Sequence, residues 1–251
     1  MIALSALLIS PSCKKGKTEI APEIAASDEA LYKLGETYIK KNPEKARIYM
    51  RQVIDSFPKS FYAQRAKLAI ADSYFQKGDE GNLILAISEY REFISLYPLS
   101  PSAPYAQLQI GTSYFNKALK AGRDQTKTQQ ALEEFRRIIT TYPMSEEAET
   151  AREKITVCEE RLAEHTLGIG ELYYKMRAYK ASISRLREIL TEYPNFTKMD
   201  EVYFYLGDSY YKAGIIEEGI PYFSKLITDF PQSKWSQKAQ KRMEDLEQKA
   251  R

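Results

Sequence analysis

FISLYPLS, residues 93–100, is the stretch on which the fold depends, because it closes an apolar segment with an aromatic residue, a proline, one variable residue and a serine. Similar endings occur at four other places: SFPKS at 56–60, TYPMS at 141–145, EYPNFT at 192–197 and DFPQS at 229–233. Proline cannot continue the helix that it follows, and it moves the preceding residue out of helical geometry. The serine, or Thr197 in the fourth copy, is a good N-cap. Each copy therefore predicts the end of one helix and the start of the next.

The residues before each proline predict a helix with one buried face. Apolar or small residues stand one, four, five, eight and twelve positions before the proline, and these offsets share one side of an α-helix. The position twelve residues before the proline is always small: Ala46, Ala86, Ala131, Ser182 and Gly219. The position eight residues before it is large: Met50, Tyr90, Phe135, Leu186 and Phe223. The small side chains allow a neighbouring helix to approach closely.

A second signature precedes each of these helices. It consists of Leu or Ile, then a small residue, then Tyr three residues later, with the small residues at Gly35, Ala71, Gly111, Gly170 and Gly207. Glycine inside a helix costs about 1 kcal/mol relative to alanine, so small residues in register predict a tight helix contact, with the tyrosine beside it. The two alternating signatures resemble the tetratricopeptide repeat, a helical hairpin of about 34 residues. The resemblance implies an all-α solenoid of five helix pairs.

The repeats define the expected domain organisation. Five repeats cover 28–233, and 234–251 is expected to be a C-terminal cap helix with the polar outer face that a terminal repeat needs. The repeats are expected at 28–60, 61–100, 101–145, 146–196 and 197–233.

The N-terminal residues resemble the leader of a lipoprotein. Residues 1–12, MIALSALLISPS, are uncharged and mostly apolar, which predicts a signal peptide that lacks its usual basic start and so looks truncated. Cys13 follows directly and is the expected site of lipidation, including palmitate. Residues 13–27 are then a flexible tether. An ordinary cleaved signal and a cytosolic N-terminus remain alternatives.

Two interruptions of the period fall in the third and fourth repeats. From the proline to the next small residue there are 27 residues in the fourth repeat, against 13 in the others. The 14 additional residues are close to four helical turns, so they predict one long helix from about Ser145 to Met176. A polar loop is expected at 117–130. Such extensions often dock partners. The alternative is sequence variation without a function, on a surface that tolerates insertions. Pro221 predicts that the last helix of the fifth repeat starts late, near Gly219, or bends.

Composition argues against several classes of function. The net charge is only +3, from 37 Lys and Arg against 34 Asp and Glu, so nucleic acid is not an expected partner. The one histidine, His165, is seven residues from Cys158, which places the two about 10 Å apart along a helix. No spacing fits a zinc site or a phosphate loop. We therefore expect no catalysis, no metal and no cofactor.

Residues 121–196 resemble the BamD family of outer-membrane β-barrel assembly lipoproteins. The similar features are Arg123 and Asp124 in the long loop, LAEH at 162–165, YYKMRAY at 173–179 and Arg185. The resemblance implies a lipid-anchored protein on the periplasmic face of the outer membrane, with no other membrane contact. Its partners would be the barrel-forming subunit, the other lipoproteins of that complex and unfolded outer-membrane proteins.

The same resemblance implies two sets of contact residues. The barrel-forming subunit would dock at Arg123, Asp124, Arg185 and Glu188. An extended peptide from an unfolded protein would face a groove formed by Tyr32, Glu36, Lys40, Asp72, Gln76, Tyr105 and Asn116. A solvated helix face is the alternative for each of these positions.

Two other proteins of the binding class fit the repeats. One is a periplasmic tetratricopeptide protein of the Tol–Pal envelope-division system, which usually carries an N-terminal coiled coil that residues 14–27 are too short to supply. The other is a cytosolic scaffold with an apolar start. Fractionation after palmitate labelling would separate it from the BamD-like protein and from the Tol–Pal protein.

The lipidation site gives the first testable prediction. Cys13→Ala should move the protein from the outer-membrane fraction to the soluble periplasm, because the acyl chains need the cysteine thiol. Its helicity in circular dichroism should not change, since residue 13 precedes the repeats. A variant that stays in the membrane fraction would contradict lipid anchoring at this cysteine.

Overall fold

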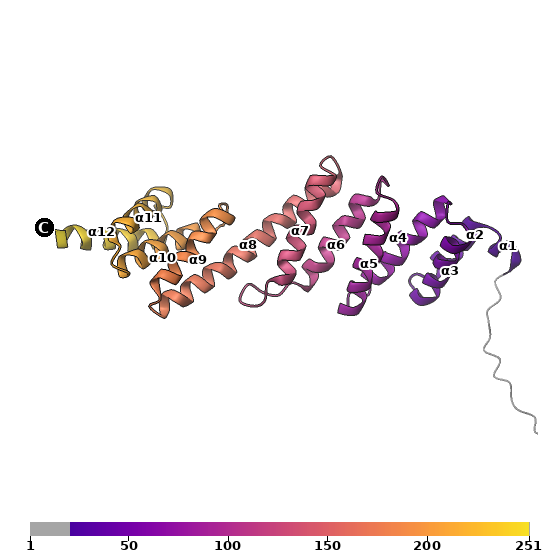
Figure 1. Ribbon diagram of the computed structural model, residues 1–251, viewed down its shortest axis with the longest axis horizontal. Helices are drawn as coiled ribbons and strands as arrows, with labels where there is room; N and C mark the ends of the chain where they lie inside the picture. The colour runs from indigo at the N-terminus through magenta and orange to yellow at the C-terminus, as the bar shows by residue number, and fades with distance from the viewer. Residues whose placement is uncertain (1–20, 251) are drawn as a thin grey trace, which may run out of the picture. The chain divides into compact units, whose positions relative to one another are not determined.

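The computed structural model describes residues 21–250, which form α-helices joined by short turns and contain no strand (Figure 1). The predicted signal peptide at 1–12, Cys13 and the tether up to residue 20 lie outside the described residues. The remainder of the tether contains the single helical turn α1 (Pro22–Ala25). Two compact units, Met1–Ala69 and Ile70–Arg251, divide the chain, and the division falls inside helix α4.

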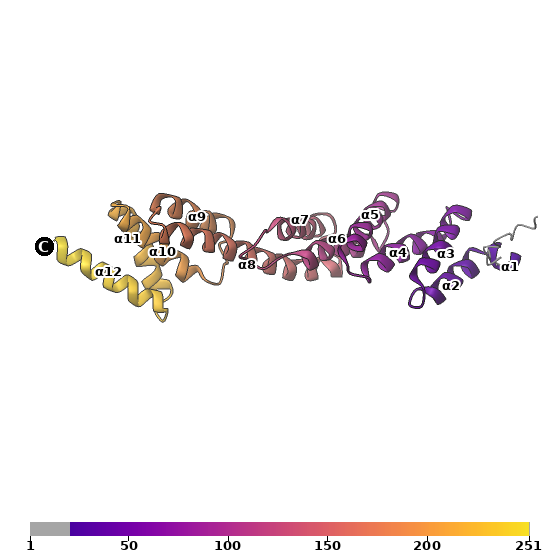
Figure 2. The same cartoon turned by 90° about the horizontal axis from the view of Figure 1, so that it is seen from below.

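Five helix pairs and a final helix follow α1. The pairs are α2 (Asp28–Tyr38) with α3 (Pro43–Ser56), α4 (Phe61–Phe75) with α5 (Glu80–Leu96), α6 (Ala103–Lys117) with α7 (Thr126–Thr141), α8 (Glu146–Lys175) with α9 (Tyr179–Glu192), and α10 (Met199–Lys212) with α11 (Ile216–Asp229). Helix α12 (Lys234–Ala250) ends the described chain. In the second unit, α8 also packs on α6 and α10 packs on α8, while α12 covers α10 and α11 (Figure 2). The predicted all-α fold of five tetratricopeptide-type pairs with a cap helix is confirmed.

The aromatic–proline motifs end their helices as the sequence predicts. The aromatic residue of each motif is the C-cap of the second helix of its pair: Phe57, Tyr97, Tyr142, Tyr193 and Phe230. Ser145 is an N-cap, since its hydroxyl accepts a hydrogen bond from the Ala148 amide at 3.2 Å. The N-cap prediction is wrong for Ser100 and Thr197. Helix α6 has Ser102 as its N-cap, and α10 begins one residue later than expected, with Lys198 as its N-cap. Thr197 donates its hydroxyl and amide hydrogens to the Glu160 carboxylate instead.

Four of the five helix pairs are held together where a large side chain lies over a glycine. A Cβ placed on Gly111 would be 2.6 Å from the Phe135 ring, and one placed on Gly207 would be 2.8 Å from the Phe223 ring. The same relation joins Gly170 with Leu186. The residue eight positions before the proline, and not the tyrosine of the first helix, therefore covers the glycine. Tight packing at this point explains why the second helix cannot slide along the first.

Helix α8 is continuous over 30 residues, with Ser145 as its N-cap and Met176 as its C-cap, so the predicted long helix is confirmed. Its residues up to position 162, among them Cys158 and Leu162, contribute to a core shared with α7. From position 163 onwards, Ala163 and Leu167 contribute to a second core with α9 to α12. Burial raises the pKa of the Cys158 thiol to about 11, as expected for a packing residue.

Helix α11 corrects the expectation at Pro221. The helix begins at Ile216, before Gly219, and runs through the proline to Asp229. Pro221 lies in the second turn and is exposed, so the ring removes one backbone hydrogen bond near a helix end. Gly219 packs against α10, where an added Cβ would be 2.9 Å from the Gly207 carbonyl oxygen. That packing outweighs the lost hydrogen bond.

Two glycines provide a test of this packing. Gly111→Ala should lower the free energy of unfolding by about 1–3 kcal/mol, because the methyl group would overlap the fully buried Phe135 ring. Gly168→Ala is the matched control, since a Cβ there meets nothing within 4 Å, and it should raise stability by about 0.5–1 kcal/mol. Urea unfolding of both variants measures the difference. Equal stability of the two would contradict a tight contact at Gly111.

Candidate partner-docking site

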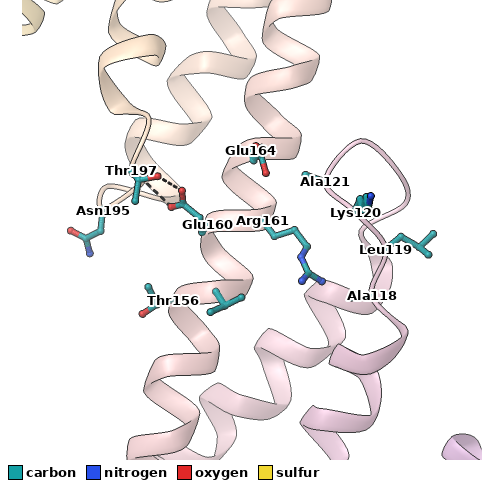
Figure 3. A pocket seen from close by; sticks show the side chains of 11 residues that line it. Ala118, Leu119, Lys120, Ala121, Thr156, Glu160, Arg161, Glu164, Asn195 and Thr197 are labelled. Carbon is teal, nitrogen blue, oxygen red and sulfur yellow. Dashed lines mark hydrogen bonds between the residues drawn. The ribbon is translucent and has the colours of Figure 1, made fainter. Parts of the chain in front are cut away.

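The two interruptions of the repeat period meet in space and line two adjoining depressions of the second unit. A depression of about 620 Å³ lies between the loop after α6, the middle of α8 and the turn before α10 (Figure 3). A second depression of about 510 Å³ continues along α8 towards its C-terminal end. The two depressions adjoin each other, because Lys120, Ala121 and Glu164 line both.

The loop that forms one wall is short and internally bonded. It covers only 118–125, shorter than the predicted 117–130, because α7 already begins at Thr126. The buried Gln125 side chain donates to the carbonyl oxygens of Lys120 and Arg123 at 2.9 and 3.0 Å, and it accepts from the Thr128 hydroxyl at 2.8 Å. These bonds satisfy backbone groups in the loop and extend α7 towards its N-terminus. The polar composition of the segment did not reveal this order.

His165 attaches the loop to α8. Its Nδ1 atom lies 2.5 Å from the Ala121 carbonyl oxygen, which requires the proton on Nδ1 for a hydrogen bond. The histidine thus has a structural partner, in keeping with the interpretation that it is not catalytic. Its role in holding the loop could not be predicted, because the two residues are 44 positions apart.

The predicted docking residues lie at two separate places, and Arg123, Asp124 and Arg185 are exposed while Glu188 is half-buried. Arg123 and Asp124 lie in the loop, where the Asp124 carboxylate accepts a hydrogen bond from the Thr126 hydroxyl at 2.8 Å and so helps to start α7. Arg185 and Glu188 lie on α9 and form an ion pair at 3.2 Å. No hydrogen bond or ion pair joins the loop pair to the α9 pair among residues 70–250. Glu188 also lines a depression of about 500 Å³ on α9.

Three predicted groove residues lie in the first unit. Tyr32 is only 5% exposed, with its ring 5.4 Å from Tyr62 and beneath the Arg65 guanidinium, so it packs the core more than it faces solvent. Glu36 lies 3.9 Å from Arg65, and both side chains are exposed. Lys40 is exposed after the end of α2.

The other four predicted groove residues lie in the second unit, and two of them contact each other. The Asp72 carboxylate accepts hydrogen bonds from the hydroxyls of Tyr105 at 3.0 Å and Tyr90 at 2.5 Å. Burial raises the Asp72 pKa above its ordinary value, although both hydrogen bonds oppose the change. Burial and the neighbouring Asp72 charge raise the pKa of Tyr105 to about 12. Gln76 and Asn116 are exposed.

Two buried carboxylates that the sequence analysis did not identify join helices of different pairs. Glu134 on α7 binds Arg91 of α5 at 2.6 Å and Gln107 of α6 at 2.7 Å. Asp208 on α10 is fully buried and binds Arg242 of the cap helix at 2.7 Å. Losing a partner would leave a buried charge uncompensated, so both networks fix the arrangement of their helices. In the sequence, both residues look like ordinary polar helix positions.

The described chain offers no grouping of His, Cys, Asp and Glu that could hold a metal ion. None of its described helices combines the length and the apolar character needed to cross a membrane.

The helix pairs and the exposed loop beside α8 define a tetratricopeptide-type protein with a surface suited to binding other proteins. Residues 24–220 match the model of the family described as outer membrane lipoprotein (YfiO), and the chain belongs to this family.

Curated relatives carry the name outer membrane protein assembly factor BamD. The protein from Caulobacter vibrioides is 30% identical over 208 residues, which cover 82% of this chain and 67% of that protein. The protein from Rickettsia prowazekii is 27% identical over 237 residues, which cover 92% of each. Among solved structures, the complex of the TPR2AB domain of yeast Sti1 with pHSP90 matches with a TM-score of 0.43 and 14% identity, covering 87% of this chain and 84% of that one.

The Asp72 site predicts a pH-dependent effect on stability. The pKa of the Asp72 carboxyl is higher in the folded protein than in the unfolded chain. Its protonated form therefore stabilises the fold at a pH below the unfolded-state pKa, and this stabilisation is lost as the pH rises through the folded-state pKa. Asp72→Asn should therefore raise the free energy of unfolding at pH 7, because the amide oxygen can still accept from Tyr90 and Tyr105 without a buried charge. The gain should shrink as the pH falls towards about 4.

Urea unfolding at both pH values measures this effect, with the exposed Asp55→Asn as the control. If Asp72→Asn were less stable than the parent at pH 7, the ionised Asp72 carboxylate could not be destabilising the fold.

Proposed function

We propose that this protein is a non-enzymatic scaffold of the machinery that assembles β-barrel proteins in the outer membrane. The observation that carries the proposal is the match to BamD relatives over most of the chain, which includes α8 and the loop beside it. The protein would be anchored through lipid on Cys13 at the periplasmic face of the outer membrane. Its partners are the barrel-forming subunit, the other lipoproteins of the complex and unfolded outer-membrane proteins.

The barrel-forming subunit docks on the second unit, at the loop and at α9. Arg123 and Asp124 project from a loop that Gln125 and His165 hold in place, so a partner would meet an ordered surface. The Arg185–Glu188 pair is about half exposed on α9, and such a pair contributes little to folding. Its charges are therefore free to exchange partners on binding, which favours a role in recognition.

Unfolded outer-membrane proteins bind the helix faces that carry the predicted groove residues. In the second unit, the Asp72–Tyr105 pair supports this proposal, because a carboxylate with a raised pKa is held at a cost to stability. The carboxylate and the tyrosine hydroxyl can bond the amide groups of an extended peptide. Exposed Gln76 and Asn116 add further amide donors and acceptors. In the first unit, Glu36 and Lys40 provide exposed charges.

Photo-crosslinking tests the proposed partner. A photo-reactive residue at position 124 or 185 of the full-length chain should capture a large outer-membrane β-barrel protein, because both positions are exposed and belong to the proposed docking pairs. Mass spectrometry of the crosslinked product from outer-membrane fractions identifies it. Position 140, exposed on α7, is the control and should give a much lower yield. Capture of Tol–Pal components, or of no membrane protein, would overturn the proposal.

A further inference from the structure

The geometry of the 620 Å³ depression beside α8 points to a more specific ligand. We infer that this depression, which we call the α8 groove, binds an acidic segment of the partner protein, with one carboxylate next to an apolar side chain. The inference rests on the proposed function and specifies the chemistry by which the partner is recognised. It concerns residues that neither the repeat pattern nor the family resemblance singled out.

The first argument is the uneven pairing of charges in the groove. Glu160 is occupied by the amide and hydroxyl of Thr197, and Glu164 forms an ion pair with Lys198 at 2.5 Å. Both acidic residues are thus bound to the turn that precedes α10. Arg161 and Lys120 line the same groove, and within residues 21–250 neither forms an ion pair with a carboxylate. Together with Lys198 these residues carry one net positive charge, because Glu160 is hydrogen-bonded but keeps its negative charge while Arg161 and Lys120 are both cationic.

The second argument is the direction in which these side chains point. In Figure 3, Glu160 points from α8 towards Thr197, whereas Arg161 points the other way, towards the loop that carries Leu119 and Lys120. Arg161 therefore points to the side of the groove on which the loop carries Lys120. A carboxylate that enters between α8 and the loop would meet both and would lie away from the two occupied glutamates.

The third argument is that Arg161 is already held in place. Its guanidinium carbon lies 5.0 Å from the centroid of the Phe115 ring on α6, a cation–π contact. The Lys154 ammonium lies 5.0 Å from the same ring and adds positive charge nearby. A guanidinium that is held before binding loses less side-chain entropy when it forms a bidentate bond to a carboxylate. An acidic ligand fits such a group better than a neutral one.

The fourth argument is the apolar lining beside the cationic residues. Leu119 of the loop and Val157 of α8 are 44% and 46% exposed, and both line the groove. Single exposed apolar residues are common, but two in one depression next to unpaired cations form a mixed surface. A ligand that carries a leucine-like side chain next to Asp or Glu would cover both features. The adjoining 510 Å³ depression, which includes the half-exposed Leu172, lets the segment continue along α8.

The experiment uses a photo-reactive residue at position 157 of the full-length chain in outer-membrane fractions, followed by sequencing of the crosslinked peptide. We expect a segment from the periplasmic part of a β-barrel protein, with Asp or Glu within about three residues of the crosslink, the reach of an extended chain across the groove. Arg161→Gln and Lys120→Gln should each lower the yield by about tenfold, because they remove the charge that pairs with the carboxylate. Arg161→Lys should retain part of it.

Arg152→Gln is the matched control. It removes the same charge from the same helix, but Arg152 is paired with Glu149 and does not line the groove. Its crosslinking yield should equal that of the parent. Thermal unfolding of all variants checks that they fold. We expect Lys120→Gln to keep the midpoint of the parent and Arg161→Gln to lower it by no more than about 4 °C, because the lost contact with Phe115 is worth only about 0.5–1 kcal/mol. A loss of yield that follows a loss of folding in Arg161→Gln would overturn the inference.

Other outcomes separate this inference from the proposed function. A captured segment without Asp or Glu, a crosslink to lipid, no crosslink at position 157, or an unchanged yield in Arg161→Gln would overturn the acidic-segment inference. If positions 124 and 185 still capture the barrel-forming subunit, the proposed function stands. If those positions capture Tol–Pal components while position 157 captures an acidic segment, the groove chemistry stands and the proposed function fails.

Discussion

The buried stripe of α8 is the constraint on which the second unit depends. One side of this helix serves two hydrophobic cores in turn, first with α7 through Cys158 and Leu162, and then with α9 to α12 through Ala163 and Leu167. The additional 14 residues permit this because they complete nearly four turns and return the apolar residues to the same face. An insertion of two residues more or fewer would turn the stripe away from one of the cores.

The length of α8 also creates the candidate docking surface. A helix of ordinary repeat length would leave no exposed middle section, whereas here that section faces the loop after α6 and forms the groove with it. His165 holds the loop against α8, and Gln125 stabilises the loop from within. A surface whose parts are fixed before binding loses little conformational entropy when a partner docks.

Buried charges in the second unit serve different purposes. Glu134 is compensated by an arginine from another helix pair and Asp208 by an arginine from the cap helix, and both so fix the order in which the helices pack. Asp72 has tyrosine hydroxyls as its hydrogen-bond partners, and its carboxyl pKa is raised by burial. The first two carboxylates fit a structural role, and for the third we propose a binding role. Buried acidic residues thus differ in role according to their partners, and these partners are known only from the three-dimensional structure.

The helix pairs, the continuous α8 and the aromatic C-caps could be predicted from the sequence, because each depends on residues within a few turns of one another. The repeated spacing of small and large residues was sufficient to place them. The cap at Lys198, the start of α11 at Ile216 and the length of the loop could not be predicted so well, because longer-range contacts compete with local preference there. The unpaired state of Arg161 was also beyond sequence reasoning. It depends on Thr197 and Lys198, more than 30 positions away, which occupy the two neighbouring glutamates.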